Sequence, residues 1–213
     1  MTADADLLEQ YLALDTATVS DALDNCGLPP MWGRPRIAGF AATVQLEPLN
    51  ADHAGAHILT GAIANAGAEN VMVIANGGRI DVSCWGGIVS AGAAMRSIRG
   101  VVADGACRDA GQARDLGFPV FARAQVPVTA RGRLRQKSAG APVRLGQVTV
   151  NPGDVVMADE GGVVVIPRGR AAEVLAAARG VNAREEQIEA EVRAGVPLPQ
   201  AMRDERLAGT EAP

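Results

Sequence analysis

The sequence has few of the side chains that build disulfide-bonded or zinc-bound proteins. Of its 213 residues only three are cysteines, Cys26, Cys84 and Cys107, and they show no CxxC spacing. Neither a disulfide framework nor a zinc ribbon is therefore indicated. The two histidines, His53 and His57, lie four residues apart without the glutamate of a zincin motif, so we interpret them as packing or surface residues.

Aromatic residues, an excess of basic charge and long apolar runs are also missing. Aromatic residues make up 3% of the chain and the net charge is −4, which argues against a nucleic-acid partner. No apolar run reaches the ~18 residues needed to cross a bilayer. The start, Met1-Thr-Ala-Asp4, is acidic where a signal peptide is basic. We expect a cytoplasmic protein without a membrane partner.

One basic cluster stands against this acidic background, Arg131-Gly-Arg133-Leu-Arg135-Gln-Lys137. It has small and apolar residues between its charges but no aromatic side chain on which bases would stack. We interpret it as a solvated loop, and the alternative is a contact with an anionic partner.

The composition that is present, 48% hydrophobic and 21% charged, is typical of a globular protein. Residues 71–75 and 101–103 read as buried strands, with a helix over 88–99 between them whose apolar positions include Ile88, Met95 and Ile98. Another helix is expected over 109–116, short strands cluster between 143 and 166, and a helix covers about 169–194. We predict one α/β domain over residues 1–213.

The first candidate site is the glycine pair Gly86-Gly87, which opens the helix predicted from Ile88. The first turn of a helix has unpaired N–H groups and the positive end of the helix dipole, so it attracts phosphate or carboxylate. A plain turn is the alternative interpretation of the two glycines.

The second candidate site follows the strand at 101–103 and contains Asp104, Arg108 and Asp109. Ligands of open α/β sheets bind beyond the carboxyl ends of strands. Arg108 offers a planar fork for a carboxylate or an enolate oxygen, and Asp109 is a hard ligand for Mg²⁺ or Mn²⁺. The alternative is that Asp109 caps the next helix and Arg108 pairs with it.

Taken together, these segments resemble the RraA-like family, which contains 4-hydroxy-4-methyl-2-oxoglutarate/4-carboxy-4-hydroxy-2-oxoadipate aldolases and regulators of ribonuclease E activity. The motifs that carry the resemblance are Ser20-Asp-Ala-Leu-Asp24, Arg36-Ile-Ala-Gly39, Trp85-Gly-Gly87, Gly100-Val-Val-Ala-Asp-Gly-Ala-Cys-Arg-Asp109, Gly117-Phe-Pro-Val-Phe-Ala122, Val150-Asn-Pro-Gly-Asp154 and Ala158-Asp-Glu-Gly-Gly-Val-Val-Val-Ile-Pro167. The most informative spacing is Gly87, then twenty residues, then Arg108-Asp109.

The resemblance implies a swivelling-type β/β/α sandwich that assembles as homotrimers or homohexamers with active sites at subunit interfaces. Enzymatic members are divalent-metal pyruvate aldolases that also decarboxylate oxaloacetate. By position, Asp109 would be the metal ligand and Arg108 would stabilise the enolate oxygen. Backbone amides of Gly86, Gly87, Ile88 and Val89 would hold the substrate carboxylate.

An acid from a neighbouring subunit's C-terminal helix assists in the family, and Glu185 or Glu186 matches it. Glu185 also occupies one position of the apolar stripe of that helix, where the alternative is a solvent-facing residue.

The sequence departs from the family pattern in one respect. Active members have a further carboxylate near the metal, at the position of Gly87 or three residues after Asp109, where this chain has Gln112. A glutamine accepts a hydrogen bond but brings no charge, and fewer charged ligands weaken the binding of hard cations. Asp104 or a C-terminal glutamate would have to compensate.

Three functions follow from the resemblance. The first is a metal-dependent lyase that cleaves a carbon–carbon bond of a small 2-oxo acid, with Mg²⁺ or Mn²⁺. The second is a non-catalytic regulator that binds a ribonuclease or helicase. The third keeps the enolate chemistry but isomerises or tautomerises an oxo acid.

Overall fold

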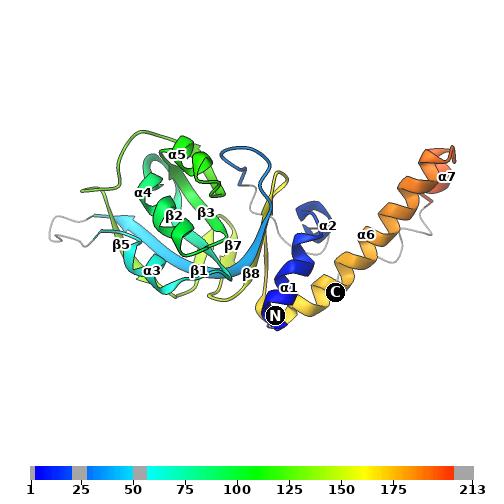
Figure 1. Ribbon diagram of the computed structural model, residues 1–213, viewed down its shortest axis with the longest axis horizontal. Helices are drawn as coiled ribbons and strands as arrows, with labels where there is room; N and C mark the ends of the chain where they lie inside the picture. The colour runs from blue at the N-terminus through cyan, green and yellow to red at the C-terminus, as the bar shows by residue number, and fades with distance from the viewer. Residues whose placement is uncertain (1–2, 21–27, 50–56, 204–213) are drawn as a thin grey trace.

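The computed structural model describes residues 3–20, 28–49 and 57–203, and a mixed β-sheet runs through its centre (Figure 1). The sheet has seven strands in the order β4-β3-β2-β1-β8-β9, with β5 paired to β1. Its strands are β1 (Ile37–Pro48), β2 (Asn70–Trp85), β3 (Gly100–Cys107), β4 (Val120–Gln125), β5 (Leu134–Ala139), β8 (Val155–Asp159) and β9 (Gly162–Ile166). A separate hairpin consists of β6 (Val143–Leu145) and β7 (Val148–Val150).

One group of helices covers a face of the sheet, and another group covers the end of the sheet formed by β8 and β9. They are α1 (Ala3–Leu12), α2 (Thr16–Ser20), α3 (Thr60–Asn65), α4 (Gly87–Met95), α5 (Ala110–Asp115), α6 (Ala171–Arg193) and α7 (Leu198–Ala201), with a 3₁₀ turn at Arg168–Arg170. Strands β1 to β4 are parallel, and α4 connects β2 to β3 as the sequence predicted. Every residue of β3 is buried, which agrees with its continuous run of small and apolar side chains.

Three layers follow from the alternation of side chains along the strands. Met72 and Ile74 of β2 pack with α3, α4 and α5 on one face of the sheet. Val71 and Val73 point the other way and pack with the β6–β7 hairpin. The α1 and α2 helices and the start of α6 cover the far end of the sheet, over β8 and β9. The predicted β/β/α sandwich is thus confirmed.

Strand β2 is much longer than the expected strand at 71–75, because the glycine pair at 77–78 does not end it. The pairing with β3 passes from Ala75–Asp104 to Arg79–Gly105, so residues 76–78 are looped out of register. Gly77 and Gly78 have φ of 63° and 72°, which glycine adopts without the steric cost of a β-carbon. The glycines therefore make a bulge inside one strand, and the strand continues to Trp85.

The basic cluster is only partly the solvated loop that the sequence suggested. Leu134–Ala139 forms β5, which pairs antiparallel with β1. Arg135 and Lys137 both form ion pairs with Glu47 of β1. These ion pairs could not be predicted from the sequence pattern, because Glu47 is far from the basic cluster along the chain.

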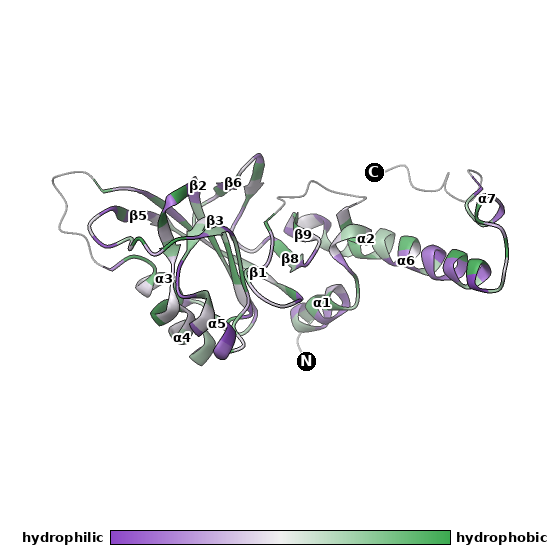
Figure 2. Cartoon of the chain, turned by 90° about the horizontal axis from the view of Figure 1, so that it is seen from above, coloured by the Kyte–Doolittle hydropathy of each residue, from purple (hydrophilic) through white to green (hydrophobic). Residues whose placement is uncertain are grey.

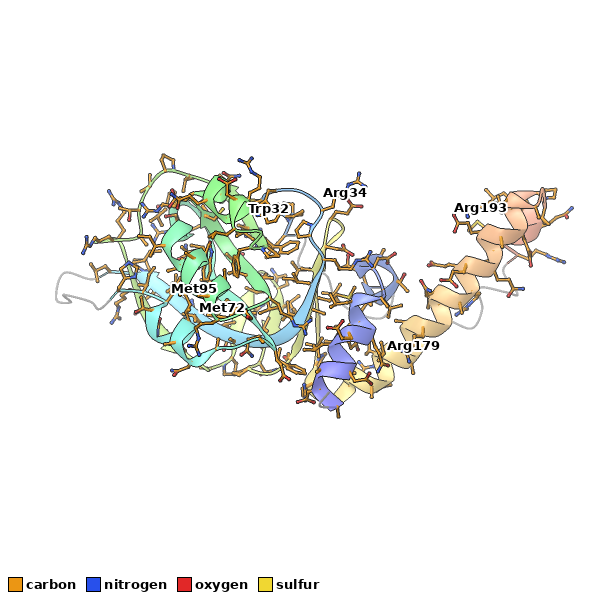
Figure 3. All side chains as sticks on the ribbon, viewed as in Figure 1. Trp32, Arg34, Met72, Met95, Arg179 and Arg193 are labelled. Carbon is orange, nitrogen blue, oxygen red and sulfur yellow. The ribbon has the colours of Figure 1, made fainter. Side chains whose placement is uncertain are left out.

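Helix α4 turns a different face outward from the one expected. Ile88 and Met95 are 81% and 89% exposed, whereas Ile98, expected on the same face, is buried (Met95 is labelled in Figure 3). The reason is that the helix ends at Met95, so Ile98 belongs to the following turn and not to the stripe.

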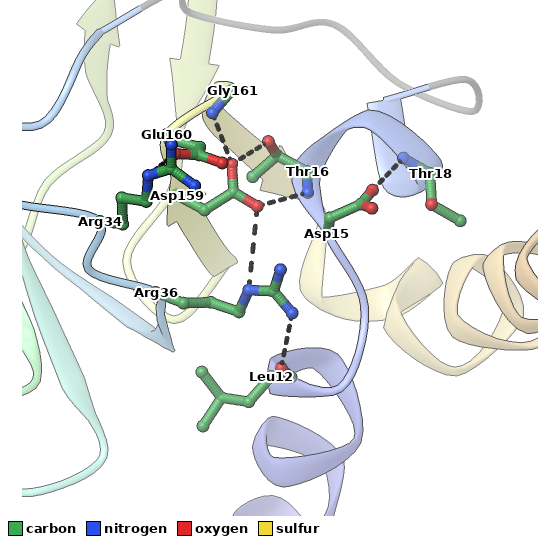
Figure 4. A network of polar contacts seen from close by, with 9 residues as sticks. All are labelled: Leu12, Asp15, Thr16, Thr18, Arg34, Arg36, Asp159, Glu160 and Gly161. Atoms are coloured by element: carbon green, nitrogen blue, oxygen red, sulfur yellow. Dashed lines mark hydrogen bonds and ion pairs between the residues drawn. The ribbon is translucent and has the colours of Figure 1, made fainter.

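A carboxylate far along the chain fastens the N-terminal helices to the sheet (Figure 4). Asp159 accepts hydrogen bonds from the amide and hydroxyl of Thr16 at 2.9 and 2.5 Å and from the amide of Gly161 at 2.8 Å. Asp15 caps α2 by accepting a bond from the Thr18 amide at 2.7 Å. Cys26 and His53 lie outside the described residues.

Helix α6 confirms the C-terminal helix expected at about 169–194, and it projects beyond α1 (Figure 1). Its buried residues all lie in its first eight positions and are Ala171, Val174, Leu175 and Ala178. Figure 2 shows the helix becoming more hydrophilic further from the sheet, and Figure 3 shows Arg179 and Arg193 along this projecting part. Within the part of the chain that the structure describes, no helix is long and apolar enough to cross a membrane.

Candidate functional site

The two candidate segments meet because neighbouring parallel strands end side by side. Trp85, the last residue of β2, pairs with Cys107, the last residue of β3. The amide of Arg108 continues the ladder by donating to the carbonyl of Trp85 at 2.9 Å. The glycine pair and the Arg108-Asp109 pair therefore leave the sheet together at the carboxyl ends of the strands, where open α/β sheets bind ligands.

Asp109 is directed toward α4 and not toward the helix that follows it. Its backbone is left-handed, with φ of 57° and ψ of 33°, and its carboxylate makes no capping bond to α5. Instead, Oδ2 accepts a bond from the Gly87 amide at 3.2 Å and lies 3.3 Å from Nε of Arg108. A non-glycine residue in this conformation is uncommon and costs free energy, so strain accompanies this placement. The alternative interpretation is therefore wrong about the cap, because the Asp109 side chain does not bind α5, and right about the pairing of Arg108 with Asp109.

The glycine pair allows other side chains to approach the backbone closely. A β-carbon on Gly86 would lie 3.2 Å from Nε of Arg108 and 3.3 Å from Oδ2 of Asp109. A β-carbon on Gly87 would overlap the carboxamide of Gln112. Since the Gly87 amide already binds Asp109, the first-turn donors of α4 that remain for a ligand are those of Ile88 and Val89.

A buried hydrogen-bond chain holds the start of α4 in place. The indole N–H of Trp85 donates to Oγ of Ser90 at 2.8 Å, and Ser90 donates to the carbonyl of Gly86 at 3.0 Å. Trp85 also stacks on Phe118, with ring centroids 6.0 Å apart. The helix tip is therefore ordered by packing and hydrogen bonds before any ligand binds.

A cleft of about 310 Å³ opens in front of this helix tip. Its lining residues come from α4, the strand ends and two loops, and they are Leu49, His57, Ile58, Leu59, Ser83, Cys84, Trp85, Gly86, Gly87, Ile88, Val89, Arg108, Thr129, Ala130, Arg131, Gly132 and Leu134. The loop at 129–132 was not expected here. Only the basic charge of Arg131 hinted at it, as the alternative interpretation of a contact with an anionic partner.

The two described cysteines near the cleft are not nucleophiles. Burial raises the pKa of the Cys84 thiol to about 12 and that of the Cys107 thiol to about 11, so both stay protonated at neutral pH. Their side chains pack in the core on the helical face of the sheet. The sequence-based interpretation of these cysteines as small buried residues is confirmed.

Asp104 lies on the other face of the sheet and cannot assist Asp109. It is 2% exposed, and its Oδ1 accepts a bond from Nε of Arg123 at 2.5 Å while Oδ2 accepts one from the Gly146 amide at 3.3 Å. Alternation along β3 decides this, because Ala103 and Cys107 face the helices and Asp104 faces the β6–β7 hairpin.

Glu185 and Glu186 are also far from the cleft within one chain. Both are exposed on α6, and Glu186 accepts a bond from Nδ2 of Asn182 at 2.8 Å. In Figure 1 this part of α6 lies beyond α1, at the opposite end of the molecule from α4 and α5. Gln112, in contrast, is exposed on α5 directly beside Gly87 and Asp109.

The donor set suits a divalent cation that is bound jointly with a ligand. Among the residues described, no group of three His, Cys, Asp or Glu side chains forms a complete cage. Mg²⁺ in proteins commonly takes one or two carboxylates and completes its shell with water and ligand oxygens. Asp109 offers one such carboxylate, 38% exposed and held by the Gly87 amide, with the Gln112 carboxamide nearby.

Comparison with known proteins points to one family. The model of the RraA-like family, described as aldolase/RraA, matches residues 16–165. The chain is 33% identical over 205 residues to protein DlpA of Legionella pneumophila, covering 93% of this chain but only 33% of that protein. It is 30% identical over 189 residues to a putative 4-hydroxy-4-methyl-2-oxoglutarate aldolase of Halalkalibacterium halodurans, covering 86% of this chain and 87% of the relative.

Solved structures agree with this comparison. An uncharacterized protein from Pseudomonas syringae superposes with a TM-score of 0.86 at 32% identity, over 92% of each chain. RraAS2 of Streptomyces coelicolor, described as an unusual member of the RNase ES inhibitor RraA family, has a TM-score of 0.79 at 26% identity, over 87% of this chain and 96% of that one.

Proposed function

Because the chain belongs to the RraA-like family, we propose that it is a divalent-metal-dependent lyase that cleaves a carbon–carbon bond of a small 2-oxo acid and releases pyruvate. The observation that carries this proposal is that Arg108 and the start of α4 line one cleft, with the Asp109 carboxylate held against both of them. Relatives named as aldolases support it, since one of them aligns with most of the chain.

Arg108 has the main role in this proposal. Its side chain is 37% exposed at the cleft and pairs with Asp109, and a β-carbon on Gly86 would lie 3.2 Å from its Nε. A guanidinium stays protonated at any physiological pH and presents several donors in a rigid plane. It would bind the 2-oxo oxygen and stabilise the negative charge that develops there when the carbon–carbon bond breaks.

The start of α4 would bind the 2-oxo acid's carboxylate. The amides of Ile88 and Val89 have no acceptor in a preceding turn, and the positive end of the helix dipole adds to their attraction for an anion. Ser90 and Trp85 hold this turn rigid, so the amides need no rearrangement when the ligand binds. Arg108 and these amides together would orient the two oxygen-bearing carbons of the substrate.

Asp109, with help from the Gln112 carboxamide, would hold Mg²⁺ or Mn²⁺ beside the arginine. Such a cation acts as a Lewis acid that withdraws charge from the oxygens of a 2-oxo acid. The cleft walls contribute apolar side chains such as Leu59 and Leu134, which exclude water and so strengthen the electrostatic interactions within.

The test is release of pyruvate from oxaloacetate or 4-hydroxy-4-methyl-2-oxoglutarate with Mg²⁺ or Mn²⁺, after subtraction of the protein-free rate. We expect Arg108→Ala and Asp109→Ala to abolish turnover. The adjacent pair on α5, Arg114 and Asp115, is a matched control because its charged atoms are 3.5 Å apart and exposed. Arg114→Ala and Asp115→Ala should keep full activity.

Two outcomes would overturn the proposal. Unchanged turnover in Arg108→Ala would remove the arginine from the reaction. An inactive wild-type protein that also fails to bind oxalate, an enolate mimic, at millimolar concentration would leave the non-catalytic regulator as the better explanation.

We further propose that the protein assembles as a homotrimer or homohexamer in which the outer half of α6 reaches a neighbouring copy. None of the α6 residues beyond Ala178 is fully buried, and a helical segment with little packing is only marginally stable in water. The exposed Ile88 and Met95 of α4 offer an apolar surface beside the cleft. In such an assembly Glu185 or Glu186 would add an acid to the neighbour's site.

A further inference from the structure

We infer that Arg131 is a second anion-binding group of the cleft and that it selects 2-oxo acids with a carboxylate at the far end. This inference rests on the proposed function, because it assumes that the 2-oxo end of the ligand lies at Arg108. It assigns a role to a residue that the proposed chemistry does not use.

Arg131 differs from the other basic residues of its cluster. Nη1 of Arg133 donates to the carbonyl of Thr129 at 3.2 Å, and Arg135 and Lys137 pair with Glu47. The guanidinium of Arg131 has no ion pair or hydrogen bond with any residue that the structure describes. Three of the four basic side chains therefore bind other parts of the protein. The fourth, Arg131, lines the cleft and is available to bind a ligand.

The turn that carries Arg131 is held firmly in place. The Arg131 amide donates to Oγ1 of Thr129 at 3.2 Å, and the Ala130 carbonyl accepts bonds from the amides of Arg133 and Leu134 at 2.9 Å each. Gly132 has φ of 72°, which suits the tight reversal after Arg131. These bonds give Arg131 a defined position in place of a freely moving loop.

The same turn is anchored to the strand that leads into the helix tip. Ser83 of β2 donates to the carbonyl of Val128 through its amide at 2.9 Å and through its hydroxyl at 2.7 Å. Three residues further along the chain is Gly86, where the absence of a β-carbon leaves room for the Arg108 side chain. Arg131 and Arg108 are therefore attached to one rigid strand end, and both border the same cleft.

The chemistry of the cleft matches a ligand with two anionic ends. Both arginines and the tip of α4 are attractive to anions, and among the described residues that line the cleft there is no carboxylate, although Asp109 lies behind Arg108 and Gly87. The cleft wall also contains the apolar side chains of Ile58, Leu59 and Leu134. A volume of about 310 Å³ is at the small end of ligand cavities, which favours a short-chain dicarboxylate.

The test compares two ligands of equal chain length, 2-oxoglutarate and 2-oxovalerate, which differ by a carboxylate or a methyl group at the far end. Binding is measured by calorimetry with Mg²⁺ present. We expect wild-type protein to bind 2-oxoglutarate about tenfold more tightly. Arg131→Gln should remove this preference and leave the affinity for 2-oxovalerate unchanged, whereas Arg131→Lys should keep part of it.

Lys137→Gln is the control for charge, because it removes one positive charge from the same cluster without altering the cleft lining. This variant should keep the preference for the dicarboxylate. Three outcomes would overturn the role of Arg131 without affecting the proposed function. The wild type would bind both ligands equally, or the preference for 2-oxoglutarate would survive Arg131→Gln, or Lys137→Gln would remove that preference to the same extent. If wild-type protein binds neither ligand, the proposed function fails together with it.

Discussion

The side chain of Gln112 occupies the space that any side chain at Gly87 would need. Gln112 belongs to α5 and Gly87 to α4, and Asp109 lies against both, with its β-carbon 3.2 Å from the position of a β-carbon on Gly87. Only one of the two residues, 87 or 112, can therefore have a side chain that lies over the start of α4 beside Asp109. In this chain that group is a neutral carboxamide.

Restoring a charge at this position should strengthen cation binding. Gln112→Glu places a second carboxylate beside Asp109 with little change in shape, and we expect about tenfold tighter Mn²⁺ binding because charged oxygen ligands dominate the affinity for hard cations. Gln147→Glu makes the same charge change in the β6–β7 turn, on the other face of the sheet, and should have no effect. Titration calorimetry with Mn²⁺ measures both, and equal affinities in the two variants would contradict the placement of the cation at Asp109.

Asp104 should matter for stability and not for cation binding. Asp104→Asn leaves Arg123 without its charged partner next to a buried site, and we expect a loss of about 2 kcal/mol in the free energy of unfolding. Urea unfolding measures this loss, and Mn²⁺ affinity should stay within about twofold of wild type. A large loss of Mn²⁺ affinity in a folded Asp104→Asn protein would show that this carboxylate does reach the site.

The stabilising contribution of Asp15 should be lost in acid. The hydrogen bond from the Thr18 amide lowers the pKa of the Asp15 carboxyl below its ordinary value of 3.8. Because the folded state holds the charged form more strongly, this contribution is complete above the unfolded pKa and disappears as the pH falls through the lowered value. Urea unfolding of wild type and Asp15→Asn should differ at pH 7, and the difference should disappear as the pH falls below 3.8 through the lowered pKa of Asp15. A difference that is constant over this range would contradict the role of the charge.

The outer half of α6 should be required for assembly. Val181→Glu combined with Ile188→Glu puts charges into the half-buried positions of the projecting helix, and we expect the homotrimer or homohexamer to dissociate into monomers. Light scattering coupled to size-exclusion chromatography measures the mass. Ala183→Glu changes a neighbouring exposed position and should leave the assembly intact. Equal masses for both proteins, or a monomeric wild type, would contradict the proposed interface.

The elements near the site followed closely from sequence patterns. The buried strand at Val101, the helix after Gly87 and the helix that begins near Asp109 were all expected, because short apolar runs and glycine pairs have few structural solutions. The long β2 and the strand β5 were missed. In both cases the deciding contact is with a remote strand, since β2 pairs with β3 across a bulge and β5 pairs with β1 through Glu47.

The sequence predicted that the groups of the candidate site would lie together, but it did not predict all the residues around them. Arg108 and Asp109 were expected together because they are adjacent in the chain and follow a strand end. The position of Arg131 beside the cleft could not be predicted from residue spacing. Its turn is held there by the bond between Ser83 and Val128, which lie 45 residues apart in the chain. The sequence likewise offered Asp104 as a helper of Asp109, and strand alternation placed it on the opposite face.

The amino-acid sequence alone determined the family, the layered α/β architecture and the identity of the arginine and aspartate at the helix tip, because these depend on local patterns and on adjacent residues. Only the tertiary structure decided that the Asp109 carboxylate binds the amide of Gly87, that Gln112 covers that glycine, and that Arg131 borders the same cleft. The physical reason is that these contacts join separate elements, whose relative positions are set by strand register and core packing across the whole sheet.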